Sequence, residues 1–155
     1  GELVGTEALP TWDLHAGVGF LAAAVRAARG RDDEPTPLTL VEPYRVAARA
    51  ARRNLPGAEV AVGRTAEAYL DRYRRLPRRA LVLTDPPRSG LEPPLRAALA
   101  RWKPRRLLML SCDPATWARD TGFLLGHGFT LAHLELVDLF PSTHHVEVLA
   151  VLEAP

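Results

Sequence analysis

Short apolar runs alternate along the chain with longer stretches in which apolar residues recur at helical spacing. The apolar runs predict strands at Pro10–His15, Pro37–Val41, Ala58–Val62, Ala80–Thr84, Arg106–Ser111, Phe129–Asp138 and His145–Leu152. The stretches between them predict helices at Gly19–Arg29, Arg45–Asn54, Thr65–Arg75, Pro94–Trp102 and Pro114–Leu125. Strands that alternate with helices in this way form a parallel sheet covered on both faces. The pattern therefore predicts an α/β fold with a doubly wound, mostly parallel sheet of seven strands.

The last two predicted strands break this rhythm. Only the short segment Phe140–Thr143 separates them, which leaves no room for a helix. Strands joined by so short a connection run antiparallel. We therefore expect a C-terminal antiparallel hairpin at or near the edge of the sheet.

Length and composition fit a single globular domain of 155 residues, with 47% apolar and 25% charged residues. No apolar run reaches the roughly 18 residues of a membrane span, and the first residues lack the pattern of a signal peptide. These features favour a cytoplasmic protein without a membrane partner. The net charge of +2 does not by itself indicate nucleic-acid binding. Most arginine clusters fall at expected helix C-termini, where a cation offsets the helix dipole.

Candidate ligand-binding residues follow the first two predicted strands, because ligands bind outside the carboxyl ends of parallel strands. The first strand leads into Gly17 and Gly19, and such glycines let the backbone approach a ligand at a helix N-terminus. The second strand leads into Glu42, and a carboxylate there commonly accepts hydrogen bonds from both hydroxyls of an adenosine ribose. A tight turn and a solvated strand-end carboxylate are the alternative interpretations.

The fourth predicted strand leads into Asp85-Pro86-Pro87-Arg88. The two prolines hold the chain extended and remove two N–H donors, which fixes the direction of Asp85. A rigid acidic loop at this edge can hold a planar heterocycle or a cofactor. An ordinary loop is the alternative.

The single cysteine, Cys112, follows the fifth predicted strand, with Asp113 placed as the N-cap and Pro114 as the first residue of the next helix. One cysteine excludes an internal disulfide. The helix dipole stabilises a thiolate at this position, whereas the adjacent carboxylate of Asp113 opposes it. Most lone cysteines are small core residues. The position of Cys112 at a strand end and a helix N-terminus nevertheless favours a nucleophile.

The last predicted strand carries Glu147 between two valines, where its carboxylate is a candidate general base. The adjacent pair His144 and His145 suggests a metal at first sight. No further residues have the spacing of a tetrahedral site, so no metal is expected.

Four segments, Asp13–Phe20, Asp85–Leu91, Ser111–Asp120 and Phe140–Glu147, resemble in their order the SAM-dependent RNA 5-methyluridine methyltransferases of tRNA and 23S rRNA. The resemblance covers the catalytic domain of that family almost end to end. It implies that residues 1–155 form a Rossmann-like class I SAM methyltransferase domain. The N-terminal oligonucleotide-binding domain, the central RNA-binding insertion and the iron–sulfur cysteines of the family are expected to be absent, so no cluster is expected.

The resemblance also implies a reaction and a site. The reaction is methyl transfer from SAM to carbon 5 of a uridine in structured rRNA or tRNA, with Cys112 as the nucleophile and Glu147 as the base. The cofactor-binding residues would be Asp13, His15, Gly17, Gly19, Phe20, Glu42, Thr65 and Asp85, with Thr65 near the place of an adenine-facing acid. Asp85, Arg88 and Arg119 are the candidate RNA-binding residues.

Two other functions are compatible with the sequence. One is a SAM methyltransferase that acts on an exocyclic amine, but such enzymes favour an aromatic residue where this chain has Arg88, and they need no cysteine. The other is a degenerate SAM-fold module that binds RNA or a partner without turnover. The presence of both Cys112 and Glu147 argues against the degenerate module, because drift should remove the nucleophile and the base first.

Overall fold

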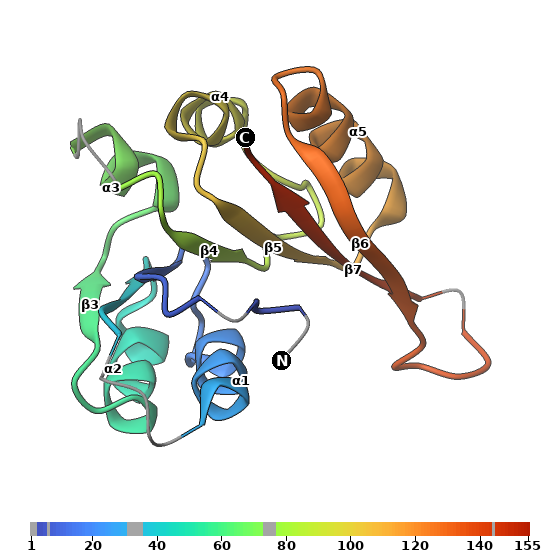
Figure 1. Ribbon diagram of the computed structural model, residues 1–155. Helices are drawn as coiled ribbons and strands as arrows, with labels where there is room; N and C mark the ends of the chain where they lie inside the picture. The colour runs from blue at the N-terminus through green and yellow to red at the C-terminus, as the bar shows by residue number, and fades with distance from the viewer. Residues whose placement is uncertain (1–2, 6, 31–35, 73–76, 144) are drawn as a thin grey trace.

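The computed structural model describes residues 3–5, 7–30, 36–72, 77–143 and 145–155, which form one sheet with helices on both faces (Figure 1). The strands are β1 (Thr11–Asp13), β2 (Leu38–Glu42), β3 (Glu59–Val62), β4 (Leu81–Thr84), β5 (Arg106–Ser111), β6 (Thr130–Val137) and β7 (Glu147–Glu153). The helices are α1 (Phe20–Arg29), α2 (Arg45–Asn54), α3 (Ala66–Arg72), α4 (Pro93–Trp102) and α5 (Pro114–Leu125). The predicted α/β fold with a seven-stranded sheet is confirmed for these residues.

The strand order in the sheet is β3-β2-β1-β4-β5-β7-β6. Strands β1 to β5 pair in parallel, and β7 runs antiparallel between β5 and β6. Strand β6 is therefore the outer strand, and the predicted antiparallel hairpin at the sheet edge is confirmed. Because β7 is reversed, its first residue lies at the edge where the parallel strands end.

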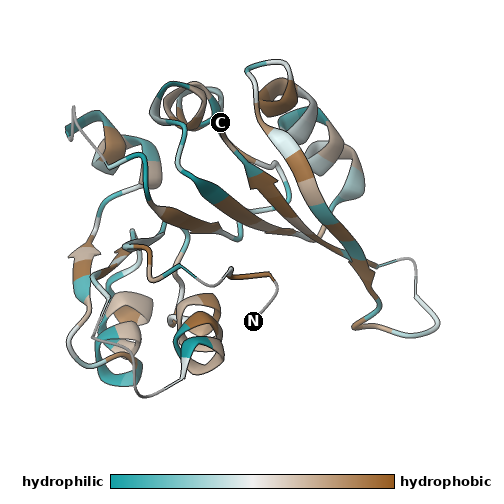
Figure 2. Ribbon diagram, in the orientation of Figure 1, coloured by the Kyte–Doolittle hydropathy of each residue, from teal (hydrophilic) through white to brown (hydrophobic). Residues whose placement is uncertain are grey.

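The helices form two layers, with α1 and α2 on one face of the sheet and α3, α4 and α5 on the other (Figure 1). Each layer encloses a hydrophobic core. Ala22 and Ala51 belong to the core under α1 and α2, whereas Leu95, Leu99 and Leu124 belong to the core under α4 and α5. Figure 2 shows β4 and β7 as hydrophobic along most of their length, as expected for strands covered on both faces.

Most predicted element ends lie within one residue of the observed ones, and three differ by more. The predicted strand Pro10–His15 is too long, because the chain leaves β1 after Asp13 and turns through Gly17 and Gly19, whose φ angles are positive. The last strand begins at Glu147 rather than at His145. The predicted helix Thr65–Arg75 is described as α3 only to Arg72, since residues 73–76 lie outside the described residues.

Helices α1 to α4 carry arginines in their last turns, as the sequence predicted. These are Arg26 and Arg29 in α1, Arg52 and Arg53 in α2, Arg72 in α3 and Arg101 in α4. A cation there faces the negative end of the helix dipole. Among the described residues, none of the helices combines the length and the apolar character that a membrane span requires.

Candidate active site

The candidate site residues lie at the edge of the sheet where β1, β2, β4 and β5 end. Residue Ser111 at the end of β5 pairs with Val148 near the start of β7. In an antiparallel ladder the next residue of one strand lies opposite the preceding residue of the other. The register therefore brings Cys112 and Glu147 to facing positions, one at each side of the ladder end.

The turn after β1 is fastened to the end of β2 by the Glu42 side chain. One carboxylate oxygen of Glu42 accepts the backbone N–H of Gly17 at 2.8 Å, and the other accepts the N–H of Tyr44 at 2.7 Å. Gly17 has a φ of +53°, and no atom lies within 4 Å of where its Cβ would stand. The turn therefore presents an open stretch of backbone beside a buried carboxylate.

Asp13 ends β1 and is almost fully buried. Burial raises the pKa of Asp13 from 3.8 to about 7, and the charges of Asp85 and Glu42 act in the same direction, while the His15 and Ala22 amides oppose it. The raised pKa leaves a large share of the Asp13 carboxyl protonated near neutral pH. Three carboxyl groups, each following a different strand, therefore influence one another at this edge.

His15 follows in the turn, and its Nδ1 lies 2.8 Å from the hydroxyl oxygen of Thr84, the last residue of β4. Burial lowers the pKa of His15, and the charge of Glu67 opposes this. The ring is therefore predominantly neutral at pH 7. The contact with Thr84 ties the turn after β1 to the strand that leads into Asp85.

Asp85 follows β4, and its electrostatic partner is Glu147 at the start of β7. Burial of the carboxyl group raises the pKa of Asp85, and the negative charge of Glu147 raises it further. The two carboxylates come from segments 62 residues apart in the sequence, and the site brings them into mutual influence. Among the described residues, no three His, Cys, Asp or Glu side chains gather as metal ligands.

Cys112 is half-buried with a free thiol, and helix α5 begins directly after Asp113. The Asp113 side chain caps the helix by accepting the Thr116 N–H at 2.8 Å, and Pro114 is the first helical residue. The predicted N-cap and N1 positions are thus confirmed. The hydrogen bond from Thr116 lowers the pKa of Asp113, and the nearby Arg88 guanidinium contributes.

Arg88 connects the loop after β4 to the C-terminal hairpin. Its Nη2 donates to His145 Nδ1 at 3.3 Å. The same guanidinium is close enough to Asp113 to lower the pKa of that carboxyl. An exposed cation therefore stands between the segments that carry Asp85, Glu147 and Cys112.

The remaining predicted site residues are Phe20, Thr65 and Arg119. Phe20 is the first residue of α1, and its side chain is 74% exposed. Thr65 precedes α3, and its hydroxyl oxygen accepts the Ala68 N–H at 3.4 Å. Arg119 lies on α5 and donates to the Asp120 carboxylate and to the Ser89 carbonyl; the hydrogen bond with Asp120 raises the pKa of Arg119. The guanidinium that the sequence suggested as an RNA contact is thus engaged within the protein.

Sequence reasoning missed Asp120 and Arg96, which form an ion pair of 2.6 Å beneath the loop after β4. A signal for Asp120 was present. It follows Asp113 by seven residues, or two helical turns, and precedes the buried Leu124 by one turn. A charge on the buried face of a helix requires a partner.

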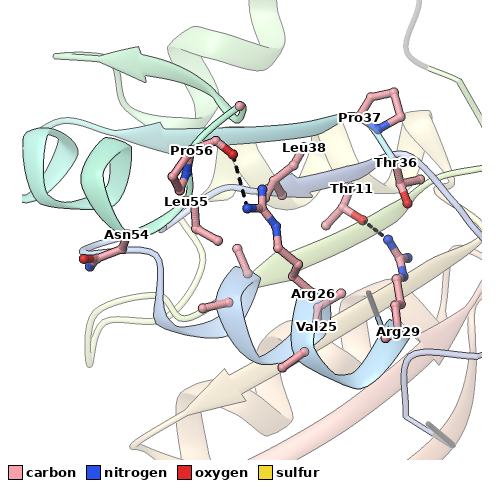
Figure 3. A pocket seen from close by; sticks show the side chains of 15 residues that line it. Thr11, Val25, Arg26, Arg29, Thr36, Pro37, Leu38, Asn54, Leu55 and Pro56 are labelled. Carbon is pink, nitrogen blue, oxygen red and sulfur yellow. Dashed lines mark hydrogen bonds between the residues drawn. The ribbon is translucent and has the colours of Figure 1, made fainter. Parts of the chain in front are cut away.

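The cavity in Figure 3 lies where β1 and β2 begin, at the end of the sheet opposite the candidate site residues. It has a volume of about 720 Å³ and lies between the C-terminal parts of α1 and α2. Arg26 donates to the Pro56 carbonyl and Arg29 to the Thr11 hydroxyl at its wall. None of the predicted site residues lines this cavity.

The strand order and the reversed β7 define the fold of the class I SAM-dependent methyltransferases. A protein of Listeria monocytogenes assigned to the S-adenosylmethionine-dependent methyltransferases superimposes with a TM-score of 0.70 at 8% identity, covering 99% of this chain and 95% of that one. At so low an identity the likeness concerns the fold alone.

A family model described as tRNA (Uracil-5-)-methyltransferase matches residues 58–154. This chain belongs to that family. An uncharacterized RNA methyltransferase of Nitratidesulfovibrio vulgaris is 37% identical over 151 residues, covering 91% of this chain and 30% of the relative. One from Aquifex aeolicus is 34% identical over 146 residues, covering 91% and 32%. The chain therefore spans about a third of the length of these curated relatives.

A crystal structure of a Pyrococcus abyssi enzyme is also similar to this chain. It is the tRNA (uracil-54, C5)-methyltransferase in complex with S-adenosyl-L-homocysteine, and the TM-score is 0.73 at 28% identity. The match covers 97% of this chain and 35% of that one. The expected Rossmann-like fold and the family resemblance are confirmed by these comparisons.

Proposed function

We propose that this chain carries the catalytic domain of a SAM-dependent RNA methyltransferase that acts on carbon 5 of a uridine in structured tRNA or rRNA. The observation that carries the proposal is the pairing of Ser111 with Val148 at the end of the β5–β7 ladder. Continued by one residue, this register would set Cys112 opposite Glu147. A thiol and a carboxylate at facing positions supply the nucleophile and the base that this chemistry needs. Membership of the family supports the same reaction.

The turn after β1 fits the cofactor SAM. Open space above Gly17 lets a ligand approach the backbone, and the buried Glu42 has further lone pairs for ribose hydroxyls. The residues proposed to line the cofactor site are Asp13, His15, Gly17, Gly19, Phe20, Glu42, Thr65 and Asp85. When bound, SAM supplies an electrophilic methyl group on its sulfonium sulfur.

The proposed role of Cys112 is to activate the uracil ring. Carbon 5 of uracil is too weak a nucleophile to take a methyl group directly. The Cys112 thiolate adds to carbon 6, a C–S bond forms, and the electron pair of the 5,6 double bond moves into an enolate. Carbon 5 would then be nucleophilic enough to form a bond with the methyl carbon, while the bond from that carbon to the sulfonium sulfur breaks and S-adenosyl-L-homocysteine leaves.

The proposed role of Glu147 is to complete the reaction. Its carboxylate removes the proton from carbon 5, the electrons re-form the 5,6 double bond, and the C–S bond to Cys112 breaks. The product is 5-methyluridine, with the thiolate regenerated. Asp85 is proposed to lie beside both the cofactor and the base, where its raised pKa keeps more of the carboxyl protonated than in an ordinary aspartate. Arg88 and Arg119 remain proposed contacts to the RNA.

A covalent adduct tests the proposal. Transcripts of tRNA and 23S rRNA containing 5-fluorouridine are incubated with the chain and SAM, then run on a denaturing gel. Fluorine at carbon 5 cannot be removed as a proton, so the adduct persists. We expect a shifted band with the wild type and with Glu147→Gln, and none with Cys112→Ala. An amine methyltransferase or an inert module would form no adduct despite binding SAM, and that result would refute the proposal.

Calorimetric titration tests the cofactor site separately. We expect SAM to bind the wild type and Glu42→Ala to weaken binding by at least about 10-fold, since a buried charged acceptor is lost. Glu59→Ala, an exposed carboxylate on β3, is the matched control. A chain that does not bind SAM at millimolar concentration, or that binds it equally well without Glu42, would contradict the assignment.

A further inference from the structure

Three residues of the loop between β4 and α4 are hydrogen-bonded to α5. The Arg88 carbonyl accepts from the Thr116 hydroxyl at 3.1 Å, the Ser89 carbonyl accepts from Arg119 Nη2 at 2.8 Å, and the Leu91 N–H donates to Asp120 Oδ2 at 2.6 Å. All three partners lie on one helix. The loop that carries Asp85 is therefore held by α5 as well as by the sheet.

Asp120 is the centre of this arrangement. Its side chain is fully buried, and its Oδ1 accepts from Arg96 Nη1 at 2.6 Å and from Arg119 Nε at 2.9 Å. Two guanidinium groups thus neutralise one buried carboxylate, which makes its hydrogen bonds charge-assisted and directional. Arg96 comes from α4 and Arg119 from α5, so Asp120 joins both helices to the loop between β4 and α4.

Gly90 shows how closely the loop lies on this ion pair. Its φ is +78°, and a Cβ at this position would collide with Asp120 Oδ2 and stand 2.6 Å from Arg119 Nη2. The backbone of the loop therefore packs directly on the charged side chains. Glycine is required here for both its conformation and its size.

We propose that Asp120 is a positioning residue that holds the Asp85 loop in register with Cys112. The proposal rests on the proposed function, in which Asp85 and Cys112 act at one site. Asp113, which caps α5 directly after Cys112, and Asp120 lie two turns apart on the same face of that helix. Both segments are thus positioned by helix α5, because Cys112 lies just before its first turn and the loop is hydrogen-bonded to residues of its first and second turns. A displacement of about 1 Å between reacting groups can lower a rate about 100-fold.

Hydrogen exchange of the Leu91 N–H tests whether Asp120 holds the loop, and it needs no enzymatic activity. In Asp120→Ala the Leu91 N–H loses its acceptor, so we expect its exchange to become about 10- to 100-fold faster. The conservative Asp120→Asn should restore part of the protection, because its amide oxygen can still accept. Trp102→Phe, which loses a buried hydrogen bond to the Pro77 carbonyl elsewhere on α4, is the matched control and should leave Leu91 unchanged.

Single-turnover formation of the 5-fluorouridine adduct tests the consequence. At saturating SAM we expect Asp120→Ala to slow it about 100-fold, with partial recovery in Asp120→Asn. Gly90→Ala should act in the same way by pushing the loop away, and it retains the Asp120, Arg96 and Arg119 side chains should Asp120→Ala fail to fold. Gly57→Ala, which has a φ of +85° and no neighbour within 4 Å, controls for backbone strain.

Two results would overturn the inference. One is an unchanged Leu91 exchange rate in Asp120→Ala, or in Gly90→Ala if the first variant does not fold. The other is a loosened loop with an unchanged rate of adduct formation. Should the wild-type chain form no adduct, the proposed function fails, and the exchange comparison still decides whether Asp120 anchors the loop.

Discussion

The buried carboxyl group of Asp13 makes the stability of the protein depend on pH. Asp13 is 1% exposed, and its pKa is raised by burial from 3.8 to about 7 in the folded chain. A raised carboxyl pKa stabilises the folded state fully at pH values below the unfolded pKa, and this contribution is lost as the pH rises through the folded pKa. The free energy of unfolding should therefore fall between about pH 4 and pH 7.

Replacement of Asp13 by asparagine removes this titration while it preserves the shape of the side chain. The difference between a pKa of 3.8 and one of about 7 corresponds to about 4 kcal/mol in total. Of this, about 2.5 kcal/mol falls between pH 5 and pH 8. We expect the difference in unfolding free energy, Asp13→Asn minus wild type, to increase by about that amount from pH 5 to pH 8.

Urea unfolding at pH 5, 6.5 and 8 measures this difference. Tryptophan fluorescence follows the transition, because Trp12 and Trp102 pack edge to face at 5.5 Å in the core. Asp71→Asn, which replaces an exposed carboxylate on α3, is the matched control. A difference between Asp13→Asn and wild type that stays constant across the three pH values would refute the assigned pKa.

Three further predictions concern the stability of a turn, of the hydrophobic core and of a helix cap. Gly19→Ala should lower the free energy of urea unfolding by about 1–3 kcal/mol, because Gly19 has a φ of +88° and a Cβ would stand 2.7 Å from Leu55 Cδ1. Gly30→Ala should lower the same free energy by less, because Gly30 has a φ of +81° but no atom within 4 Å of where its Cβ would stand. Leu99→Ala should lower the unfolding free energy by about 2–5 kcal/mol, because Leu99 is fully buried; a loss below 1 kcal/mol in calorimetry would argue against this core. Asp113→Ala should lower the melting temperature at pH 7 and have less effect as the pH falls through the lowered pKa of Asp113, whereas Asp113→Asn should retain the cap.

Much of the fold follows from local patterns. The alternation of apolar runs with helical stretches predicted the strands and helices within a few residues, and the short connection Phe140–Thr143 predicted the reversed hairpin. The exact end of β1 did not follow, because an apolar run does not tell where a chain leaves a sheet. The turn through Gly17 and Gly19 begins earlier than Leu14 and His15 suggested.

The positions of Glu42 and Cys112 were predictable, because each residue stands at the end of an apolar run that forms a strand. The site was not predictable where a side chain acts through distant partners. The sequence offered Arg119 as a candidate RNA-binding residue, but it did not predict that the Arg119 guanidinium contacts Asp120 and the Ser89 carbonyl, 30 residues earlier. A periodic pattern reveals which face of a helix is buried, but not which segment will meet it.

The position of β7 inside the sheet has a consequence for the way the protein reaches its fold during synthesis. Strand β6 pairs with β7 alone, and β7 in turn fills the place beside β5. The ribosome makes β7 after both neighbours, so β6 has no strand partner within the sheet while the first five strands can already assemble. We therefore expect the sheet to be completed late in synthesis, after β7 has been made. Glu147 should reach its position near Cys112 only at that stage.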